Sequence, residues 1–279
     1  MLPSMPEGPE IRRAADRIER AVGGKVAEEV TFAFPHLQRF EPRLCGRLVE
    51  AIETRGKAIL VRFEGDLSVY AHSQLYGRWY VMGRGKLPQT NRSLRFAIHN
   101  EKKSALLYSA SEIDVLTPAE VDRHPFLSKL GPDVLSSGID VADLVTRLSD
   151  PRFARRALHA LLLDQAFVAG LGNYLRSEVL FDAGLHPGVR LGDLSEIDRR
   201  RLARSILQVT RQAYRTGGVT NSATRVKNLK AQGMRRSEYR HHVFTRGGRS
   251  CWTCGEEILR QNLGGRKIFH CPECQPLSR

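Results

Sequence analysis

Apolar side chains recur at helical spacing between residues 9 and 23, and charged side chains occupy most of the positions between them. The apolar positions are Ile11, Ala14, Ala15, Ile18 and Val22. Pro9 falls in the first turn and a Gly-Gly pair follows the last apolar position, and both features are common at the boundaries of a helix. We therefore predict an amphipathic helix over residues 9–23.

From residue 25 to about residue 116, apolar positions alternate with polar ones. Glycine and asparagine turn signals separate the alternating segments, which are residues 26–32, 48–56, 57–65, 67–81, 94–101 and 105–116. This pattern predicts short antiparallel strands in a sandwich or barrel, with the first helix attached to them.

A helical period returns after the connection at residues 124–135. Tight breaks that contain Pro or Gly separate four predicted helices, at residues 139–148, 153–165, 173–184 and 195–214. Short helices joined in this way favour a helical domain that binds nucleic acid. The segment at residues 216–240 is Gly-rich, polar and basic, and we predict a mobile loop there. The fold class is therefore α+β.

The chain has 279 residues, 41% of them apolar, which is enough for two domains with real cores and an appendage. No run of about 18 uncharged apolar residues predicts a membrane span. No basic segment followed by an apolar stretch predicts a secretory signal. We expect a soluble protein of the cytoplasm, associated with the nucleoid.

The net charge of +14 is concentrated toward the C-terminal end. Residues 201–279 contain 16 basic and 4 acidic side chains, a balance of +12, which leaves about +2 on the first 200 residues. A positive field of this kind attracts polyanions, and without a basic amphipathic helix nucleic acid is favoured over a membrane surface. The alternative is a basic face that serves only solubility.

Four of the five cysteines form two C-x2-C pairs separated by sixteen residues: Cys251, Cys254, Cys271 and Cys274. This is the spacing of a zinc ribbon, in which four thiolates hold one tetrahedral ion. Two disulfides would require an oxidising compartment, which the absence of a predicted signal argues against. Four thiolates leave no coordination position open for water, so the predicted Zn²⁺ is structural.

Several stretches together resemble the formamidopyrimidine-DNA glycosylase family, and within it the endonuclease VIII branch. They are MPEGPEIRRAAD, TRGKAIL, HSQLYG, LLDQAFVAGLGNYLRSEVLF and the terminal ribbon with Arg266 five residues before Cys271. The resemblance extends from Met5 to Cys274 in the family's order. It implies a β-sandwich catalytic domain over residues 1–128, a helical domain with a helix-two-turns-helix motif over residues 129–240, and a zinc-ribbon finger over residues 241–279.

Pro6 and Glu7 acquire chemical roles through this resemblance. A proline inside a chain only constrains φ, whereas a proline at the N-terminus carries a free secondary amine that can attack a sugar carbon. The resulting iminium keeps its positive charge without a proton and favours β-elimination. The resemblance implies that Pro6 is the nucleophile at C1′ of the damaged nucleotide, and that Glu7 is the acid that opens the deoxyribose ring.

Two basic residues are implied to act beside the sugar. Lys57, in Thr54-Arg55-Gly56-Lys57, is placed by the family against the phosphate next to the lesion and in proton transfer. Arg266 is implied to bind the flanking phosphates through its planar guanidinium and to assist δ-elimination. Without the resemblance, the sequence favours an ordinary surface lysine at position 57.

The remaining candidate residues contact DNA by resemblance. Gln74, Leu75 and Tyr76 match the segment that fills the space left when a base is turned out of the stack. Asn173 follows Gly170-Leu171-Gly172, where it can cap a helix, and the family places it on a phosphate. After HPFL the family commonly carries an arginine phosphate contact, and this chain has Lys129, which keeps the charge but loses the bidentate geometry.

The resemblance thus implies a monomeric DNA glycosylase and AP lyase that acts on oxidised pyrimidines in duplex DNA and needs no organic cofactor. Formamidopyrimidine and 8-oxoguanine remain alternative substrates, because residues 216–240 are longer than expected for endonuclease VIII. A protein that binds lesions or regulates DNA without catalysis is the other alternative. It applies if Pro6 stays in a peptide bond: Leu2 after Met1 is too large for ordinary methionine removal, whereas a start at Met5 exposes Pro6. We expect residues 1–4 to be absent from the mature protein.

Overall fold

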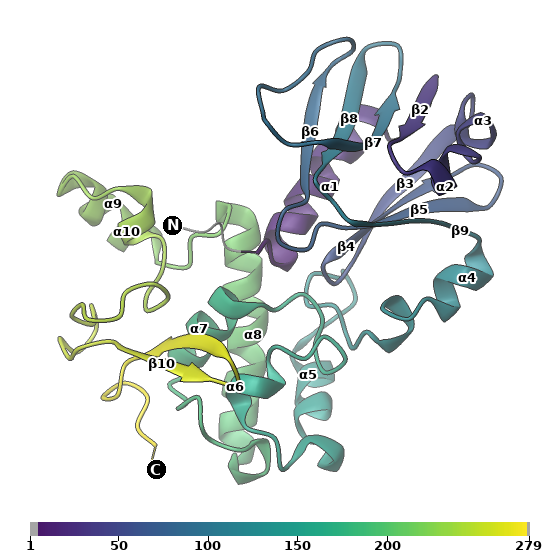
Figure 1. Ribbon diagram of the computed structural model, residues 1–279. Coiled ribbons are helices and arrows are strands. Elements are labelled where there is room, and N and C mark those ends of the chain that lie inside the picture. Colours follow the sequence, from purple (N-terminus) through teal and green to yellow (C-terminus); the bar gives the residue numbers. More distant parts are fainter. Residues whose placement is uncertain (1–4, 278–279) are drawn as a thin grey trace. The chain divides into compact units, whose positions relative to one another are not determined.

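The structure is a computed structural model that describes residues 5–277. The chain divides into two compact units, one ending at Leu130 and the other beginning at Gly131 (Figure 1). The prediction that residues 1–4 are absent from the mature protein concerns residues outside this described part. Within residues 5–277, no helix combines the length and the apolar character needed to cross a membrane.

The first unit contains two antiparallel sheets, which confirms the predicted sandwich. The five-stranded sheet has the order β1 (Lys25–Val26), β3 (Leu48–Arg55), β4 (Ala58–Phe63), β5 (Leu67–His72), β9 (Glu112–Leu116). The four-stranded sheet has the order β2 (Glu29–Phe32), β7 (Leu94–His99), β8 (Lys103–Tyr108), β6 (Arg78–Gly83). Residues 26–32, predicted as one strand, belong to both sheets, because the chain crosses from β1 to β2 within this segment.

Alternation along the strands places one face of each sheet in a shared core. On β4, Ile59, Val61 and Phe63 enter this core together with Trp79 and Phe96 from the other sheet. Ala58 and Leu60 point to the opposite face, where α4 (Pro118–Arg123) covers them through Val121. A period of two therefore accounts for both faces of β4.

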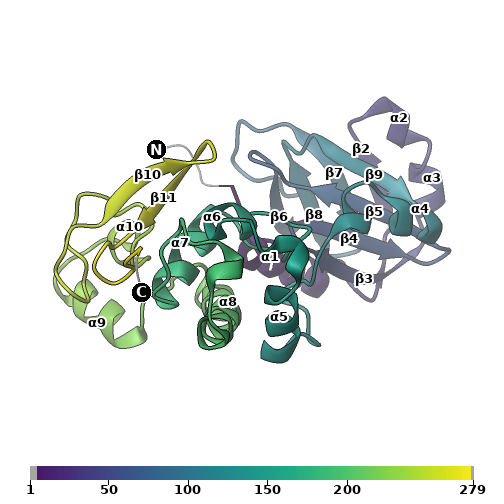
Figure 2. The same cartoon turned by 90° about the horizontal axis from the view of Figure 1, so that it is seen from below.

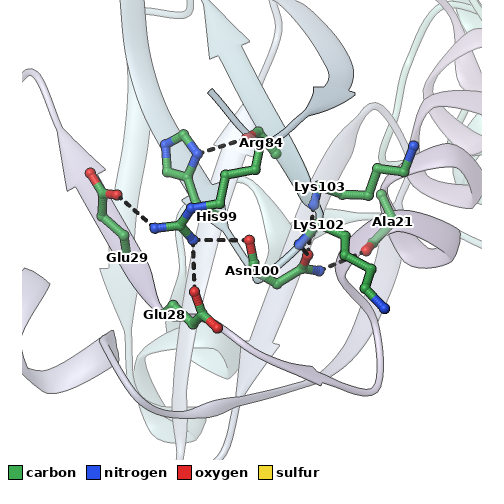
Figure 3. Close-up of polar contacts among 9 residues, drawn as sticks. Ala21, Glu28, Glu29, Arg84, His99, Asn100, Lys102 and Lys103 are labelled. Carbon is green, nitrogen blue, oxygen red and sulfur yellow. Dashed lines mark hydrogen bonds and ion pairs between the residues drawn. The ribbon is translucent and has the colours of Figure 1, made fainter. Parts of the chain in front are cut away.

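The predicted N-terminal helix is confirmed as α1 (Gly8–Val22), which packs against strands of both sheets. Its C-terminal end is held by Asn100, whose side-chain nitrogen donates to the Ala21 carbonyl at 2.9 Å (Figure 3). The Asn100 side-chain oxygen accepts from the backbone of Lys102 and Lys103, so the β7–β8 turn and the helix end are tied together. This contact, with the packing of α1 against β3 and β8, holds the helix on the sheets.

The remaining elements of the first unit are short. They are α2 (Pro35–Gln38), α3 (Glu41–Leu44) and the 3-10 turn η1 (Leu127–Lys129). Beside β2, Arg84 forms ion pairs with Glu28 and Glu29 and also donates to the Asn100 carbonyl, all shown in Figure 3. These contacts close the end of the four-stranded sheet nearest to the C-terminus of α1.

The second unit is helical, with α5 (Val141–Leu148), α7 (Asn173–Asp182) and α8 (Glu196–Thr216) packed around one core. The prediction of one helix over residues 153–165 is wrong in its extent. Only α6 (Leu158–Leu161) forms there, preceded by the turn η2 (Pro151–Phe153). Beyond α6, the side chains of Asp164 and Gln165 bond to backbone groups of the following turn and so compete with helix continuation.

The mobile loop predicted at residues 216–240 is also corrected, because this segment contains α9 (Ala223–Ala231) and α10 (Arg236–Tyr239). Ser222 caps α9 by accepting from the Arg225 backbone. Leu229 and Tyr239 are buried against Val219 in a small core of their own. The apolar positions are too sparse for a periodicity signal, which is why the sequence pattern missed these helices.

The chain ends in an antiparallel hairpin of β10 (Leu259–Leu263) and β11 (Arg266–His270). β11 packs against α7, as Figure 2 shows, and Ile268 and Phe269 enter the core of the helices. The helical segment, the hairpin and the four-cysteine cluster confirm the predicted α+β fold class.

Candidate functional site

Pro6 lies two residues before the start of α1 and lines a pocket of about 490 Å³ in the first unit. The same pocket is lined by Leu75 and Tyr76, and by the β6 residues Trp79 and Tyr80. Pro6 is half-buried. The structure therefore brings three of the predicted site residues to one cavity with aromatic walls.

Arginine side chains make this pocket basic. Arg17, Arg78 and Arg92 all contribute to its lining. Burial, followed by the charges of neighbouring arginines that include Arg78, lowers the pKa of the Arg17 guanidinium. A pocket with this concentration of positive charge suits a polyanionic ligand.

Glu7 is the N-cap residue of α1 and is only 3% exposed. It forms a capping box with Glu10, whose carboxylate accepts from the Glu7 backbone N–H at 3.1 Å. The N-terminal end of a helix carries partial positive charge, which favours a carboxylate at this position. The fold thus holds a buried carboxyl next to Pro6.

Lys57 occupies the two-residue turn between β3 and β4, where Gly56 has a φ of +60°. The turn lies beside the end of β5, because Ala58 pairs with His72. Burial is the main cause of the lowered pKa of His72, and the Lys57 ammonium lowers it further, so the two side chains are close. Lys57 is not among the residues that line the Pro6 pocket.

The loop at residues 73–77 connects β5 to β6 and carries Gln74, Leu75 and Tyr76. It closes on itself through a hydrogen bond from the Gly77 N–H to the Ser73 carbonyl at 2.7 Å. Gln74 has a φ of +45°, which is uncommon for a residue other than glycine. Tyr76 is 57% exposed, whereas Leu75 is half-buried at the pocket. The loop therefore presents a polar, an apolar and an aromatic side chain from one tight turn.

Side chains from two other segments hold this loop. Gln74 Nε2 donates to Glu112 at 2.8 Å, and the Ser111 hydroxyl donates to Gln74 Oε1 at 2.8 Å. The Arg92 guanidinium donates to the Tyr76 carbonyl. Nothing in the local sequence pattern of Ser111, Glu112 or Arg92 distinguishes these residues from ordinary surface residues.

Gly77 is the position at which this loop tolerates substitution least. A Cβ added there would lie 2.6 Å from both Cα and the carbonyl oxygen of Ser73, which are backbone atoms that cannot rotate away. We expect Gly77→Ala to open the loop and to destabilise the protein by about 1–3 kcal/mol. Urea unfolding measures the destabilisation. Gly83→Ala at the end of β6 is the control, because Gly83 does not have a positive φ and an added Cβ would meet only the flexible Lys86 side chain, at 3.6 Å; equal destabilisation by the two changes would contradict this account.

In the second unit, Asn173 is the first residue of α7 and Gly172 is its N-cap, so the predicted capping role of Asn173 is corrected. The Asn173 side-chain oxygen accepts from Arg176 at 2.6 Å. Arg176 is fully buried and also donates to the Lys267 carbonyl of β11 at 3.0 Å. Arg176 thereby links the start of α7 to the hairpin that carries Arg266, a role that no local sequence pattern around Arg176 indicates.

The two other predicted basic residues are exposed. Arg266 follows a Gly264-Gly265 turn in which both glycines have positive φ, at the tip of the β10–β11 hairpin. Lys129 ends η1 in the first unit. Neither position is constrained by burial, which is compatible with a role in binding phosphate.

The four cysteines come together as predicted. Their sulfur atoms all lie within 4.8 Å of one another, and three of the separations are 3.3, 3.5 and 3.9 Å. Sulfurs at about 2.3 Å from a tetrahedral Zn²⁺ are about 3.8 Å apart, so the cluster fits this ion. Burial raises the pKa of the Cys271 thiol to about 11, so a bound cation is needed to keep it deprotonated near neutral pH.

The sequence matches known families over most of its length. The profile of the formamidopyrimidine-DNA glycosylase N-terminal domain matches residues 5–111, and that of the family's H2TH domain matches residues 130–225. Endonuclease 8 of Enterobacter sp. (strain 638) is 46% identical over 97% of this chain and 100% of the relative, and Endonuclease 8 of Escherichia coli O6:K15:H31 is 45% identical with the same coverage.

The chain belongs to the formamidopyrimidine-DNA glycosylase and endonuclease VIII family. As a member of this family it is a DNA glycosylase and AP lyase with a four-cysteine zinc finger. The fold agrees: Fpg of Lactococcus lactis, solved with DNA that contains FAPY-dG, superposes with a TM-score of 0.77 at 20% identity, over 96% of this chain and 99% of that one. A second Lactococcus lactis Fpg complex, with N7-benzyl-Fapy-dG DNA, gives a TM-score of 0.79.

Proposed function

We propose that this member of the endonuclease VIII family removes oxidised pyrimidines from duplex DNA through a Schiff base on Pro6, followed by β- and δ-elimination. The observation that carries the proposal is the position of Pro6, beside the buried Glu7 carboxyl and in one pocket with Leu75 and Tyr76. Such a substrate would place a monomeric enzyme on the chromosomal DNA of the cytoplasm.

In the first step, the lone pair of the Pro6 amine attacks C1′ and the glycosidic bond breaks, so the base leaves with the bonding electrons. The ammonium formed on Pro6 then loses its proton, Glu7 donates a proton to the ring oxygen, the C1′–O4′ bond breaks, and the nitrogen lone pair forms an iminium between Pro6 and C1′. The position of Glu7 at the N-cap of α1 keeps this carboxyl adjacent to the amine.

The iminium then acts as an electron sink. Loss of a C2′ proton expels the 3′ phosphate, and a second elimination expels the 5′ phosphate; hydrolysis by water finally frees Pro6. We assign Lys57 and Arg266 to phosphate binding and proton transfer in these steps. Asn173 and Lys129 are assigned to phosphates along the backbone, and Gln74, Leu75 and Tyr76 to the space left by the turned-out nucleotide.

Preference for the damaged base can be tested by competition. We expect a duplex with thymine glycol to be cleaved at least about tenfold faster, in kcat/KM, than one with 8-oxoguanine. The names of the relatives that are 44–46% identical support this direction. The alternative is a purine-directed enzyme; the Lactococcus lactis Fpg structures, at 20–23% identity, hold FAPY-dG DNA in one case and oxidised-pyrimidine DNA in another and favour neither substrate. A preference for 8-oxoguanine would select that alternative.

A further inference from the structure

We propose that Ser111 and Glu112 are positioning residues that hold the Gln74 side chain in one orientation, so that the 73–77 loop enters damaged DNA with its hydrogen-bonding groups already set. The proposal rests on the proposed function only in that the loop enters the space left by a turned-out nucleotide. It concerns Ser111, at the end of the turn between β8 and β9, and Glu112, the first residue of β9, neither of which takes part in the chemistry described above.

Both ends of the Gln74 amide have a specific partner. A carboxylate only accepts hydrogen bonds, so the contact of 2.8 Å with Glu112 fixes Nε2 on that side. The Ser111 hydroxyl bonds to Oε1 at 2.8 Å from the other side. The amide retains one donor hydrogen and one acceptor site for a ligand. It cannot turn over without losing the contact with Glu112, because a carboxylate cannot donate to Oε1.

The Glu112 carboxylate is itself held by a hydrogen bond from a buried tyrosine. Its second carboxylate oxygen accepts from the Tyr70 hydroxyl at 2.8 Å, and Tyr70 is fully buried under α4. Burial, with the Glu112 contact next in importance, raises the pKa of Tyr70, so the phenol stays a donor. Gln74 is thus connected through Glu112 to the packed outer face of the five-stranded sheet.

Gln74 has both an uncommon backbone conformation and an exposed side chain, so contacts that hold its side chain are useful. Gln74 has a positive φ, and its N–H donates to His72 Nδ1 at 3.1 Å. The Gln74 side chain is exposed, and a free glutamine of this kind would sample several rotamers that DNA binding must then remove. Fixing it beforehand reduces that entropic cost, which is the general advantage of preorganised binding groups.

Because Glu112 is negatively charged, the direction in which DNA affinity changes when it is removed tests the proposal. Removing an acidic side chain strengthens binding to DNA phosphates in general, so Glu112→Ala would tighten binding if Glu112 had no other role. The proposal predicts the reverse for a duplex that contains tetrahydrofuran, an uncleavable abasic analogue. We expect Glu112→Ala to weaken this binding about tenfold, the effect of losing a hydrogen bond to a charged group. Binding to undamaged duplex should not weaken.

Three further variants make the test specific. Glu112→Gln should bind within about twofold of wild type, because its amide oxygen can still accept from Gln74 while its nitrogen donates to Tyr70. Ser111→Ala should weaken binding in the same sense as Glu112→Ala. Glu53→Ala, which removes a carboxylate paired with Arg62 on the same sheet, is the matched charge control and should not weaken binding. Thermal unfolding of each variant establishes that it is folded.

The decisive measurement is a double-mutant cycle with Gln74→Ala. If Glu112 acts through Gln74, Glu112→Ala should cause no further loss of affinity in the Gln74→Ala background. A loss of equal size in both backgrounds, or no loss in either, overturns the proposal, as does a wild-type protein that binds tetrahydrofuran duplex no better than undamaged duplex. These affinities need no catalysis, so a failure of the proposed chemistry would show separately, as the absence of cleavage by a protein that still shows the coupling.

Discussion

Protein whose first residue is Pro6 is expected to form a borohydride-stable adduct with an abasic duplex, and protein that retains Met1–Met5 is expected to form none. The physical reason is the nucleophile itself, because the nitrogen of an internal proline is an amide nitrogen whose lone pair is delocalised into the carbonyl. Loss of a catalytic nucleophile typically lowers the rate by about 10³-fold or more. Trapping followed by gel electrophoresis measures the adduct, and intact mass verifies each N-terminus.

A binding control separates this loss of chemistry from a loss of folding. Both forms should bind a tetrahydrofuran duplex with affinities within a few-fold of each other if the extension leaves α1 in place. The match of the family profile from residue 5 supports the choice of Pro6. Efficient trapping by a protein of verified mass that still carries the preceding residues would exclude Pro6 as the nucleophile.

Removal of the zinc ion is expected to have the largest effect on stability. Cys251 and Cys271 are buried in the same core as Ile268 and Phe269 of the hairpin, so the ion holds both the ribbon and part of the helical core. Structural zinc sites contribute about 10 kcal/mol or more in isolated fingers. If only about 4 kcal/mol of this appears in folding stability, Cys254→Ser should lower the Tm by about 10 °C.

Activity should fall with stability, because the hairpin carries Arg266. The matched control is Cys45→Ser, which changes the one cysteine that lies outside the cluster and in the first unit. Zinc content, Tm and AP lyase activity should be close to wild type in Cys45→Ser and reduced together in Cys254→Ser. A Cys254→Ser protein with one zinc per chain and an unchanged Tm would contradict the predicted coordination.

The sequence alone determined the features that rest on local spacing. A period of 3.6 located α1 within one residue at each end, and a period of two located the strands whose alternate residues enter the shared core. The two C-x2-C pairs located the metal cluster, because each pair lies on its own tight turn. The order of the family motifs indicated the enzyme class that the comparisons then showed.

Tertiary structure alone decided which distant side chains meet. Glu112 reaches Gln74 across 38 residues, and Arg176 reaches the Lys267 carbonyl across 91, through hydrogen bonds between groups that carry no periodic signal. The helices α9 and α10 depend on a small core that includes Val219. Local propensity and spacing are encoded within one or two turns of the chain, whereas these contacts exist only once the folded units bring the partners within hydrogen-bonding or packing distance.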